Sequence, residues 1–308
     1  MSHDLLQALA IFAAGLAAGT INTVVGSGTL ITFPTLLAFG YPPVLANVSN
    51  NVGLVPGGFS GAHGYRAELA GQRRRVIRLG SASLCGGLVG ALLLLVLPAG
   101  AFKAIVPALI GVAVVMVLIQ PRLARWMAQR QAARSAAQAG DGDLPPAPGD
   151  AGHVIGAADG SVGGTAGGGA LTQAATAVSV LPATGVADRA AAVGGPVLWF
   201  FVFCAGVYGG YFGAAQGVLL IGMLGIAFSD GLQRINAVKN VLAGLVNGVA
   251  AIMFIALTHI DWTIAGLIAA GSILGGQFGA RIGRRLPPWA LRLVIVCVGV
   301  AALIKLLA

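Results

Sequence analysis

The sequence predicts an all-α protein that crosses a membrane many times and consists of two related halves. Hydrophobic residues make up 57% of the 308 positions and charged residues only 9%, whereas a soluble domain has about 25% charged residues. The apolar runs are unbroken for roughly 17–22 residues, which is the length of a spanning helix. One patterned stretch occurs twice, at residues 15–59 and 205–248. We therefore expect a polytopic membrane protein with about 8–10 membrane segments.

The two copies of this stretch share one plan. Each has an apolar run, a glycine break, a short apolar run, a turn, and then a helix that begins with amide side chains. Moving the second copy back by 189 positions superposes matching residues: Gly28 on Gly217, Asn47 on Asn236, and Asn51 on Asn240. Interrupted hydrophobic segments at corresponding places in two halves are the best sequence indication of a transporter's binding site.

Each half contains five apolar runs. In the first half (residues 1–119) they are 5–25, 29–40, 44–62, 79–97 and 102–119; in the second half (residues 196–308) they are 196–213, 217–229, 235–257, 262–280 and 289–307. The second run of each half has about 12 residues, too few to cross about 30 Å of hydrocarbon upright. Each is therefore a tilted short span or one arm of a re-entrant hairpin, and both alternatives give the same topology.

Between the halves, residues 120–195 are rich in alanine, glycine and proline. Such a composition cannot build a packed core. We expect a largely disordered cytoplasmic linker that begins with a short basic helix near Arg122 to Arg134, lying against anionic lipid headgroups.

The arginines predict the orientation in the membrane. They lie in loops between the apolar runs or follow run five, and five crossings per half place all of them on one side. By the positive-inside rule that side is cytoplasmic. The N-terminus and the turns at 40–43, 98–101 and 259–262 then face outward, which fits a cell inner membrane. An odd number of crossings per half also inverts the second repeat relative to the first.

Several functional classes are disfavoured. The net charge is +9, but the arginines form no single basic face, so we expect no nucleic-acid partner. The chain has no Walker loop, no HExxH and no nucleophile elbow, which argues against an ATP-driven pump or an intramembrane hydrolase. We expect no enzyme activity, no cofactor and no metal. The lipid bilayer is one partner, and a homo-oligomer is compatible with the sequence.

The glycine breaks are the first candidate binding elements. They read Gly26-Ser27-Gly28-Thr29 and Ala214-Ala215-Gln216-Gly217. A short helix follows each break, and the free N–H groups at a helix N-terminus bind anions. Two such termini from inverted repeats would face each other near the membrane midplane, with Ser27, Gln216 and the close approach allowed by Gly28 and Gly217. The alternative is that these glycines only bend the chain.

The amide-bearing helices are the second candidate. Asn47 and Asn51, like Asn236 and Asn240, are spaced i, i+4 and share a helix face. Lys239 lies between the second pair, and a cation within a membrane run is a functional hypothesis by default. It would attract an anionic substrate. The alternative is that Lys239 reaches the cytoplasmic interface beside Arg234.

The paired stretches GTINTVVGSGTLITFPTLLAFGYPPVLANVSNNV and GGYFGAAQGVLLIGMLGIAFSDGLQRINAVKN resemble the sulfite exporter TauE/SafE family of membrane transporters. The resemblance covers nearly the whole chain apart from the linker and implies secondary transport of small anions, sulfite and organosulfonates among them. The candidate site that it implies is Asn22, Ser27, Gly28, Asn47, Asn51, Gln216, Asn236, Lys239 and Asn240. The chain departs from the family pattern in its long linker and in Asn50, where a lysine is frequent.

These observations favour a carrier that exports a small anion, sulfite or an organosulfonate, by alternating access. Two other classes stay open at this point. A passive anion channel would have the same composition and repeats. A membrane scaffold that does not transport would instead use the linker to dock a soluble partner.

Overall fold

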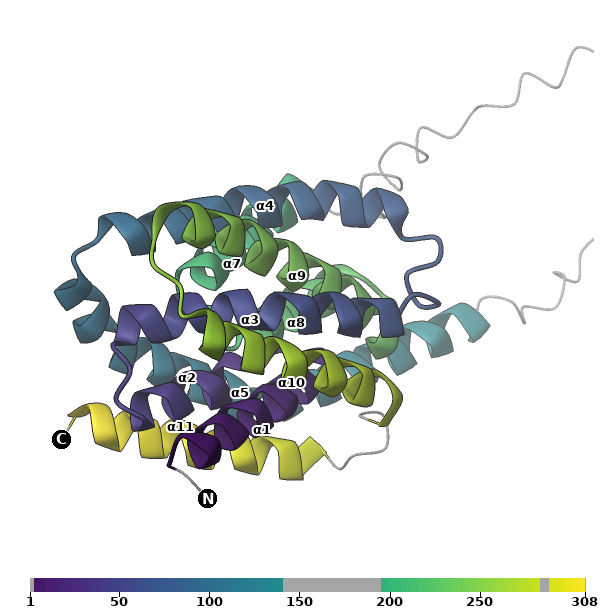
Figure 1. The fold of residues 1–308 in the computed structure, drawn as a ribbon. Coiled ribbons are helices and arrows are strands. Elements are labelled where there is room, and N and C mark those ends of the chain that lie inside the picture. Colours follow the sequence, from purple (N-terminus) through teal and green to yellow (C-terminus); the bar gives the residue numbers. More distant parts are fainter. Residues whose placement is uncertain (1–2, 141–194, 283–287, 308) are drawn as a thin grey trace, which may run out of the picture.

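The computed structural model describes residues 3–140, 195–282 and 288–307, and in these ranges every regular element is a helix (Figure 1). The expected linker residues 141–194 lie outside the described ranges. The helices are α1 (His3–Val24), α2 (Thr29–Ala38), α3 (Pro43–Gly64), α4 (Arg73–Val96), α5 (Ala99–Gly140), α7 (Pro196–Tyr211), α8 (Gln216–Ala227), α9 (Leu232–Leu257), α10 (Trp262–Ile282) and α11 (Pro288–Leu307).

Five of these helices are long and apolar enough to cross a membrane, namely α1, α4, α5, α9 and α10. By contrast, α2 has 10 residues and α8 has 12, which corresponds to about 15 and 18 Å of helix. Both are shorter than the hydrocarbon layer of about 30 Å. The short second run of each half is therefore a short helix, as the sequence predicts.

Each short helix turns back toward the end of the molecule from which the preceding helix came. Gln7, near the start of α1, donates a hydrogen bond to the hydroxyl of Tyr41, just after α2, at 2.9 Å. In the second half, Trp199 near the start of α7 donates to Ser81, and Phe228 after α8 packs under Arg75. Because Ser81 and Arg75 both lie in the first part of α4, α7 and α8 also form a hairpin.

The helices of the two halves pair reciprocally. Helix α1 packs on α10 and α7 packs on α4; α3 packs on α10 and α9 packs on α4; α2 meets α11 and α8 meets α5. In the two closest pairs the backbones touch through glycine: a Cβ on Gly275 would collide with the carbonyl of Leu16, and one on Gly90 with that of Val207. Gly90 and Gly279 also occupy equivalent places, 189 positions apart, and Gly279 packs on Thr20 of α1. Such small-residue interfaces suit packing in lipid.

This pairing interleaves the two halves of the sequence. We call α1, α2, α3 and α10 the first unit, and α4, α7, α8 and α9 the second unit. Each unit contains three helices from one half and one helix from the other. Helices α3 and α9 join the two units, and α5 pairs with α11.

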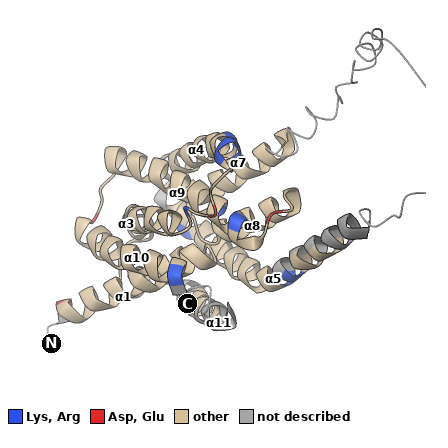
Figure 2. Cartoon of the chain, turned by 90° about the vertical axis from the view of Figure 1, so that its right-hand side faces the viewer, with Lys and Arg blue, Asp and Glu red and all other residues tan. Residues whose placement is uncertain are grey.

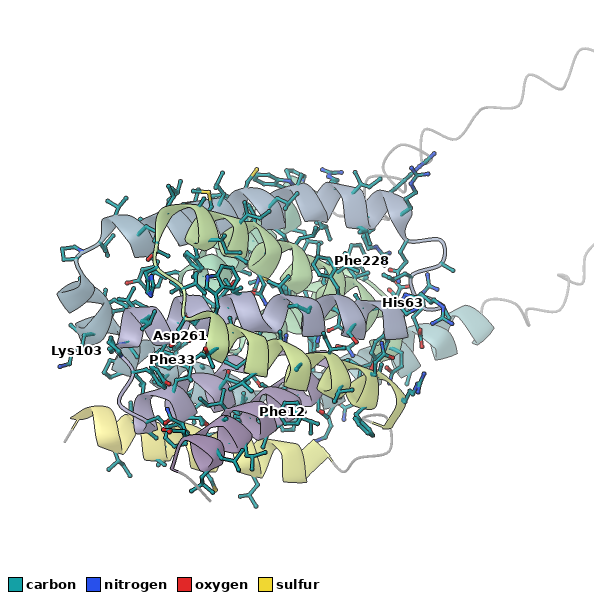
Figure 3. The ribbon with its side chains drawn as sticks, viewed as in Figure 1. Phe12, Phe33, His63, Lys103, Phe228 and Asp261 are labelled. Atoms are coloured by element: carbon teal, nitrogen blue, oxygen red, sulfur yellow. The ribbon has the colours of Figure 1, made fainter. Side chains whose placement is uncertain are left out.

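The loops gather at two opposite ends of the helix bundle. At one end lie Lys103 and Asp261 (Figure 3), and the backbone N–H of Asp261 donates to Ser49 at 3.0 Å. Burial and the charge of Asp261 raise the pKa of Tyr41, which is part of the same end. His63 and Phe228 lie toward the other end (Figure 3). The C-terminus of α3 therefore lies on the His63 side of the bundle, and the C-terminus of α9 lies on the opposite, Asp261 side.

The second of these ends carries a charged network. The side chain of Asp230, between α8 and α9, accepts hydrogen bonds from Arg75 of α4 and, at 3.1 Å, from Arg234 of α9. Gln72 donates to the carbonyl of Arg234 at 3.2 Å. Seen from this side (Figure 2), basic residues lie on α4, on α5 and near α8. The arginine-bearing loops after α3 and after α8 therefore share one end, as the sequence predicts.

Helix α5 differs from the expectation. The apolar run ends near residue 119, but the helix continues through the basic residues to Gly140. At 42 residues it is about 63 Å long, and Figure 1 shows it projecting beyond the other helices. The expected separate basic helix is thus a continuation of α5, although Pro121 lies within it.

Candidate functional site

The two glycine breaks meet in the interior of the molecule. The N–H of Gly217, in the first turn of α8, donates to the carbonyl of Gly26 at 3.0 Å. Gly26 has φ +89°, a conformation that glycine adopts without a steric cost. A Cβ on Gly217 would lie 2.9 Å from both the Gly26 oxygen and the side chain of Lys239. The breaks therefore touch, and only glycine fits where they touch.

Lys239 lies beside this contact and is fully buried. Its Nζ donates to the carbonyls of Asn22 at 2.9 Å and Thr23 at 3.2 Å. Both carbonyls belong to the last turn of α1, where the helix dipole is negative and favours a cation. The interface alternative for Lys239 is wrong for this structure, and in the described residues no carboxylate pairs with it.

Two amides join Lys239 at the same helix end. Asn236 and Asn240 each donate from Nδ2 to the carbonyl of Thr23, at 3.1 and 3.3 Å. The i, i+4 spacing thus places both amides on the face of α9 that covers the end of α1. One turn of α9 supplies all these donors, because residues 236, 239 and 240 share a helix face.

A related arrangement occurs at the end of α7. Asn47 of α3 donates from Nδ2 to the carbonyl of Tyr211, the last residue of α7, at 3.1 Å. Asn50, which corresponds to Lys239, instead donates to Thr29 at 3.5 Å, in the first turn of α2. Each half therefore covers the end of the other half's broken helix, but among the described residues only the end of α1 receives a cation.

Several polar atoms around the breaks are buried without a hydrogen-bond partner. They are Ser27 Oγ, Gln216 Nε2, Asn50 Oδ1, Asn51 Oδ1 and Asn236 Oδ1, and each of these residues is at most 8% exposed. An unsatisfied buried polar group costs about 1–3 kcal/mol. A ligand that bonds to these atoms would offset that cost.

The second break holds Gln216 in a particular backbone geometry. Ala215, immediately before α8, has φ +60°, a left-handed conformation that costs a residue with a Cβ about 1–2 kcal/mol. The side chain of Gln216 lies against Gly209 of α7, where a Cβ would collide with it. The chain therefore maintains local strain and a close contact to position the start of α8.

The structure brings most of the sequence-predicted residues together. Asn22, Gly217, Asn236, Lys239 and Asn240 surround the contact between the breaks. Gly28 packs against the carbonyl of Ala18 and the Cβ of Asn22, which places the start of α2 beside the end of α1. Asn47 lies at the end of α7, and Ser27, Asn51 and Gln216 are buried.

Sequence reasoning missed the backbone acceptors. The carbonyls of Asn22, Thr23 and Tyr211 accept hydrogen bonds from the amides and the ammonium. A backbone carbonyl leaves no residue-type signal. The position of each break just after an apolar run was the available signal, because the end of a helix always exposes carbonyls.

A comparison with protein families supports the organisation in two related halves. A family model described as Sulfite exporter TauE/SafE matches residues 11–193 and again residues 169–306, which indicates duplicated halves. A curated relative from Sinorhizobium sp., "Probable membrane transporter protein ORF9", is 30% identical over 100 residues. That match covers 32% of this chain and 38% of the relative. No solved structure matches the chain significantly.

Proposed function

This chain belongs to the sulfite exporter TauE/SafE family of membrane transporters, and from that premise we propose that it exports a small sulfur-containing anion, sulfite or an organosulfonate, by alternating access. The observation that supports the proposal most directly is the burial of Lys239. This residue carries a fully buried ammonium beside two glycine breaks, and its partners are backbone carbonyls. A charge buried in a membrane protein is costly, and an ionisable residue there is a functional-site hypothesis by default.

The substrate site of this proposal comprises Asn22, Ser27, Gly28, Asn47, Asn51, Gln216, Gly217, Asn236, Lys239 and Asn240. In the described conformation the end of α1 satisfies Lys239. A substrate anion would replace the Asn22 and Thr23 carbonyls as the partner of Lys239. Ser27 and Gln216 would add donors, since their buried polar atoms have no partner.

Alternating access requires two bodies that move relative to each other, and we assign these bodies to the first and second units. Inverted repeats support this assignment. The equivalent helices α3 and α9 end at opposite ends of the molecule (Figure 3), and every main helix contact of one half has a counterpart in the other. Rocking of one inverted repeat against the other about a central site is the usual movement of such carriers. Here the moving bodies would be the interleaved units.

The same proposal includes the placement in the cell. The protein resides in the inner membrane, with the arginine-bearing end in the cytoplasm and the N-terminus outside. Residues 1–119 and 196–308 form the two transmembrane repeats, joined by the cytoplasmic linker 120–195. The shared end of the loops after α3 and α8 supports this orientation.

Flux of radiolabelled sulfite into proteoliposomes tests the proposal. The expected result is saturable flux that unlabelled sulfite inhibits and that protein-free liposomes lack. Single-channel currents that exceed the turnover of a carrier would indicate a passive channel instead of a carrier. Deletion of residues 140–185 should leave the flux intact, whereas a scaffold would show no flux and would lose its partner through this deletion.

A further inference from the structure

The unpartnered buried atoms of the site include acceptors as well as donors. Donors are expected around an anion, and Ser27 Oγ and Gln216 Nε2 serve that role. Asn236 Oδ1 is different, because it is a buried amide oxygen without a hydrogen-bond partner. An amide oxygen repels an oxyanion and can be satisfied only by a donor.

The orientation of the Asn236 amide follows from its neighbours. Its other atom, Nδ2, donates to the carbonyl of Thr23 at 3.1 Å. A carbonyl only accepts, so reversing the amide would set two oxygens against each other. Asn236 therefore presents Oδ1 away from that bond, one helical turn from Lys239.

The presence of both unpartnered donors and unpartnered acceptors limits the chemistry of the ligand. A fully deprotonated oxyanion offers acceptors alone and would leave Asn236 Oδ1 unpaired at a cost typical of buried groups. An anion that also bears an O–H group would bond to Lys239 through its charged oxygens and to Asn236 through its hydroxyl. Asn50 Oδ1 and Asn51 Oδ1, also unpartnered, add acceptors in the other half.

We propose that the transported anion is itself a hydrogen-bond donor, such as a singly protonated oxyanion or a hydroxylated organosulfonate, and that Asn236 Oδ1 accepts its hydrogen. This inference rests on the proposed anion transport and narrows its substrate class. Sites built to bond a substrate hydroxyl discriminate strongly against analogues that lack it.

Two sulfonates of similar size test the inference at one fixed pH. Hydroxyethanesulfonate and propanesulfonate carry the same anionic head, but only the first has a hydroxyl. Each is added to proteoliposomes as a competitor of radiolabelled sulfite flux. The hydroxylated compound should inhibit at about tenfold lower concentration, the equivalent of one well-made hydrogen bond. In a second arm, acidification should favour sulfite over sulfate, because sulfite takes up a proton near neutral pH and sulfate does not.

The chain offers a matched pair of variants. Asn236→Ala and Asn240→Ala each remove one donor to the Thr23 carbonyl, but of the two amide oxygens only that of Asn236 is both fully buried and without a partner. The tenfold preference should disappear in Asn236→Ala and persist in Asn240→Ala. The preference is a ratio, so a lower flux in either variant does not affect it.

The outcomes separate the two proposals. Equal inhibition by both sulfonates in the unaltered protein, together with no gain of sulfite over sulfate on acidification, would overturn the inference while leaving anion transport in place. A preference that survives in Asn236→Ala would overturn the role of that residue. Absence of sulfite flux and of inhibition by either sulfonate would overturn anion transport and the inference with it. A preference in one arm only would identify the donor source as sulfonate hydroxyl or bound proton.

Discussion

At the scale of single residues, the proposed transport depends on where Lys239 places its charge. The ammonium is fully buried and lies between the negative end of α1 and the start of α8. The end of α1 satisfies the ammonium in this structure, so in the proposed carrier one cation would serve both the empty and the loaded state. This exchange of partners would link substrate binding to the release of α1.

Changing Lys239 to glutamine should lower sulfite flux by at least tenfold, because a neutral amide cannot pair with the anion's charge. Glutamine can still donate to one α1 carbonyl, so the protein should remain folded. Flux in proteoliposomes, with thermal unfolding in detergent beside it, makes the comparison. Asn247→Ala, two turns further along α9, is the control and should transport normally. Equal flux in Lys239→Gln and the parent would remove Lys239 from the substrate site.

The sequence favours a buried position for Lys239 but does not predict the partners of its ammonium. Its register between Asn236 and Asn240 and its position in an apolar run were enough to single out Lys239. Its partners are the Asn22 and Thr23 carbonyls, and carbonyls have no residue-type signal. Whether Lys239 is buried or reaches the lipid interface could be decided only by the fold, which buries it.

At the scale of elements, the glycine breaks determine how close the two hairpins come. The Gly217 N–H bonds to the Gly26 carbonyl, and neither residue has room for a side chain. The sequence predicts breaks with facing helix N-termini. It does not predict that the breaks touch, because contact between segments 189 positions apart depends on the packing of all the helices between them.

Gly217→Ala should separate the breaks and lower both the unfolding temperature and the sulfite flux. The added Cβ would lie 2.9 Å from the Gly26 oxygen, closer than van der Waals contact allows, and overpacking costs about 1–3 kcal/mol. Gly244→Ala on α9 is the control, since nothing lies within 4 Å of its Cβ. That control should gain about 0.5–1 kcal/mol from the helix preference of alanine. Identical behaviour of the two variants would contradict the close contact.

The network around Asp230 makes a prediction about pH. Burial alone would raise the pKa of Asp230, but hydrogen bonds and charges from Arg75 and Arg234 outweigh burial and lower it. A carboxylate with a lowered pKa stabilises the fold at pH values above its ordinary pKa. This contribution is lost as the pH falls through the lowered pKa. Asp230→Asn should therefore be about 1 kcal/mol less stable than the parent at neutral pH.

The pH dependence checks the cause of that difference. The gap in unfolding temperature between the parent and Asp230→Asn should close on acidification below the ordinary carboxyl range, because the parent then also carries an uncharged side chain. Unfolding in detergent over a series of pH values measures it. A gap that stays constant through this acid range would mean that the charge of Asp230 stabilises nothing.

At the scale of the whole molecule, sequence halves and structural units differ. The repeats could be recognised from Gly28, Asn47 and their counterparts, and the apolar runs predicted the helices except α5, which continues to Gly140. The sequence did not predict that α4 packs on helices of the second half, or that α10 packs on helices of the first half. Run lengths and loop charges fix which end a helix starts from, but not which neighbour it packs on. Glycines such as Gly90 and Gly275 indicate that their helices can pack closely on another helix. They do not indicate which helix that is.

A reversible lock between the units tests the central claim, that an anion crosses by movement of these two bodies. In a protein without its native cysteines, paired cysteines at Gly58 of α3 and Gly244 of α9 would join the units, since a Cβ on Gly58 lies 3.8 Å from the Gly244 Cα. The matched pair at Gly87 and Val246 lies within the second unit. A Cβ on Gly87 lies 3.1 Å from the Val246 Cα. Both pairs thus lie in contact across two packed helices, and a count of free thiols before and after oxidation shows whether each disulfide forms.

Radiolabelled sulfite flux is then measured in proteoliposomes before oxidation, after oxidation, and after reduction. The account predicts flux in both reduced proteins, loss of flux on oxidation only for the pair that joins the units, and recovery on reduction. Flux that continues through the locked pair, or that is absent throughout, would contradict it.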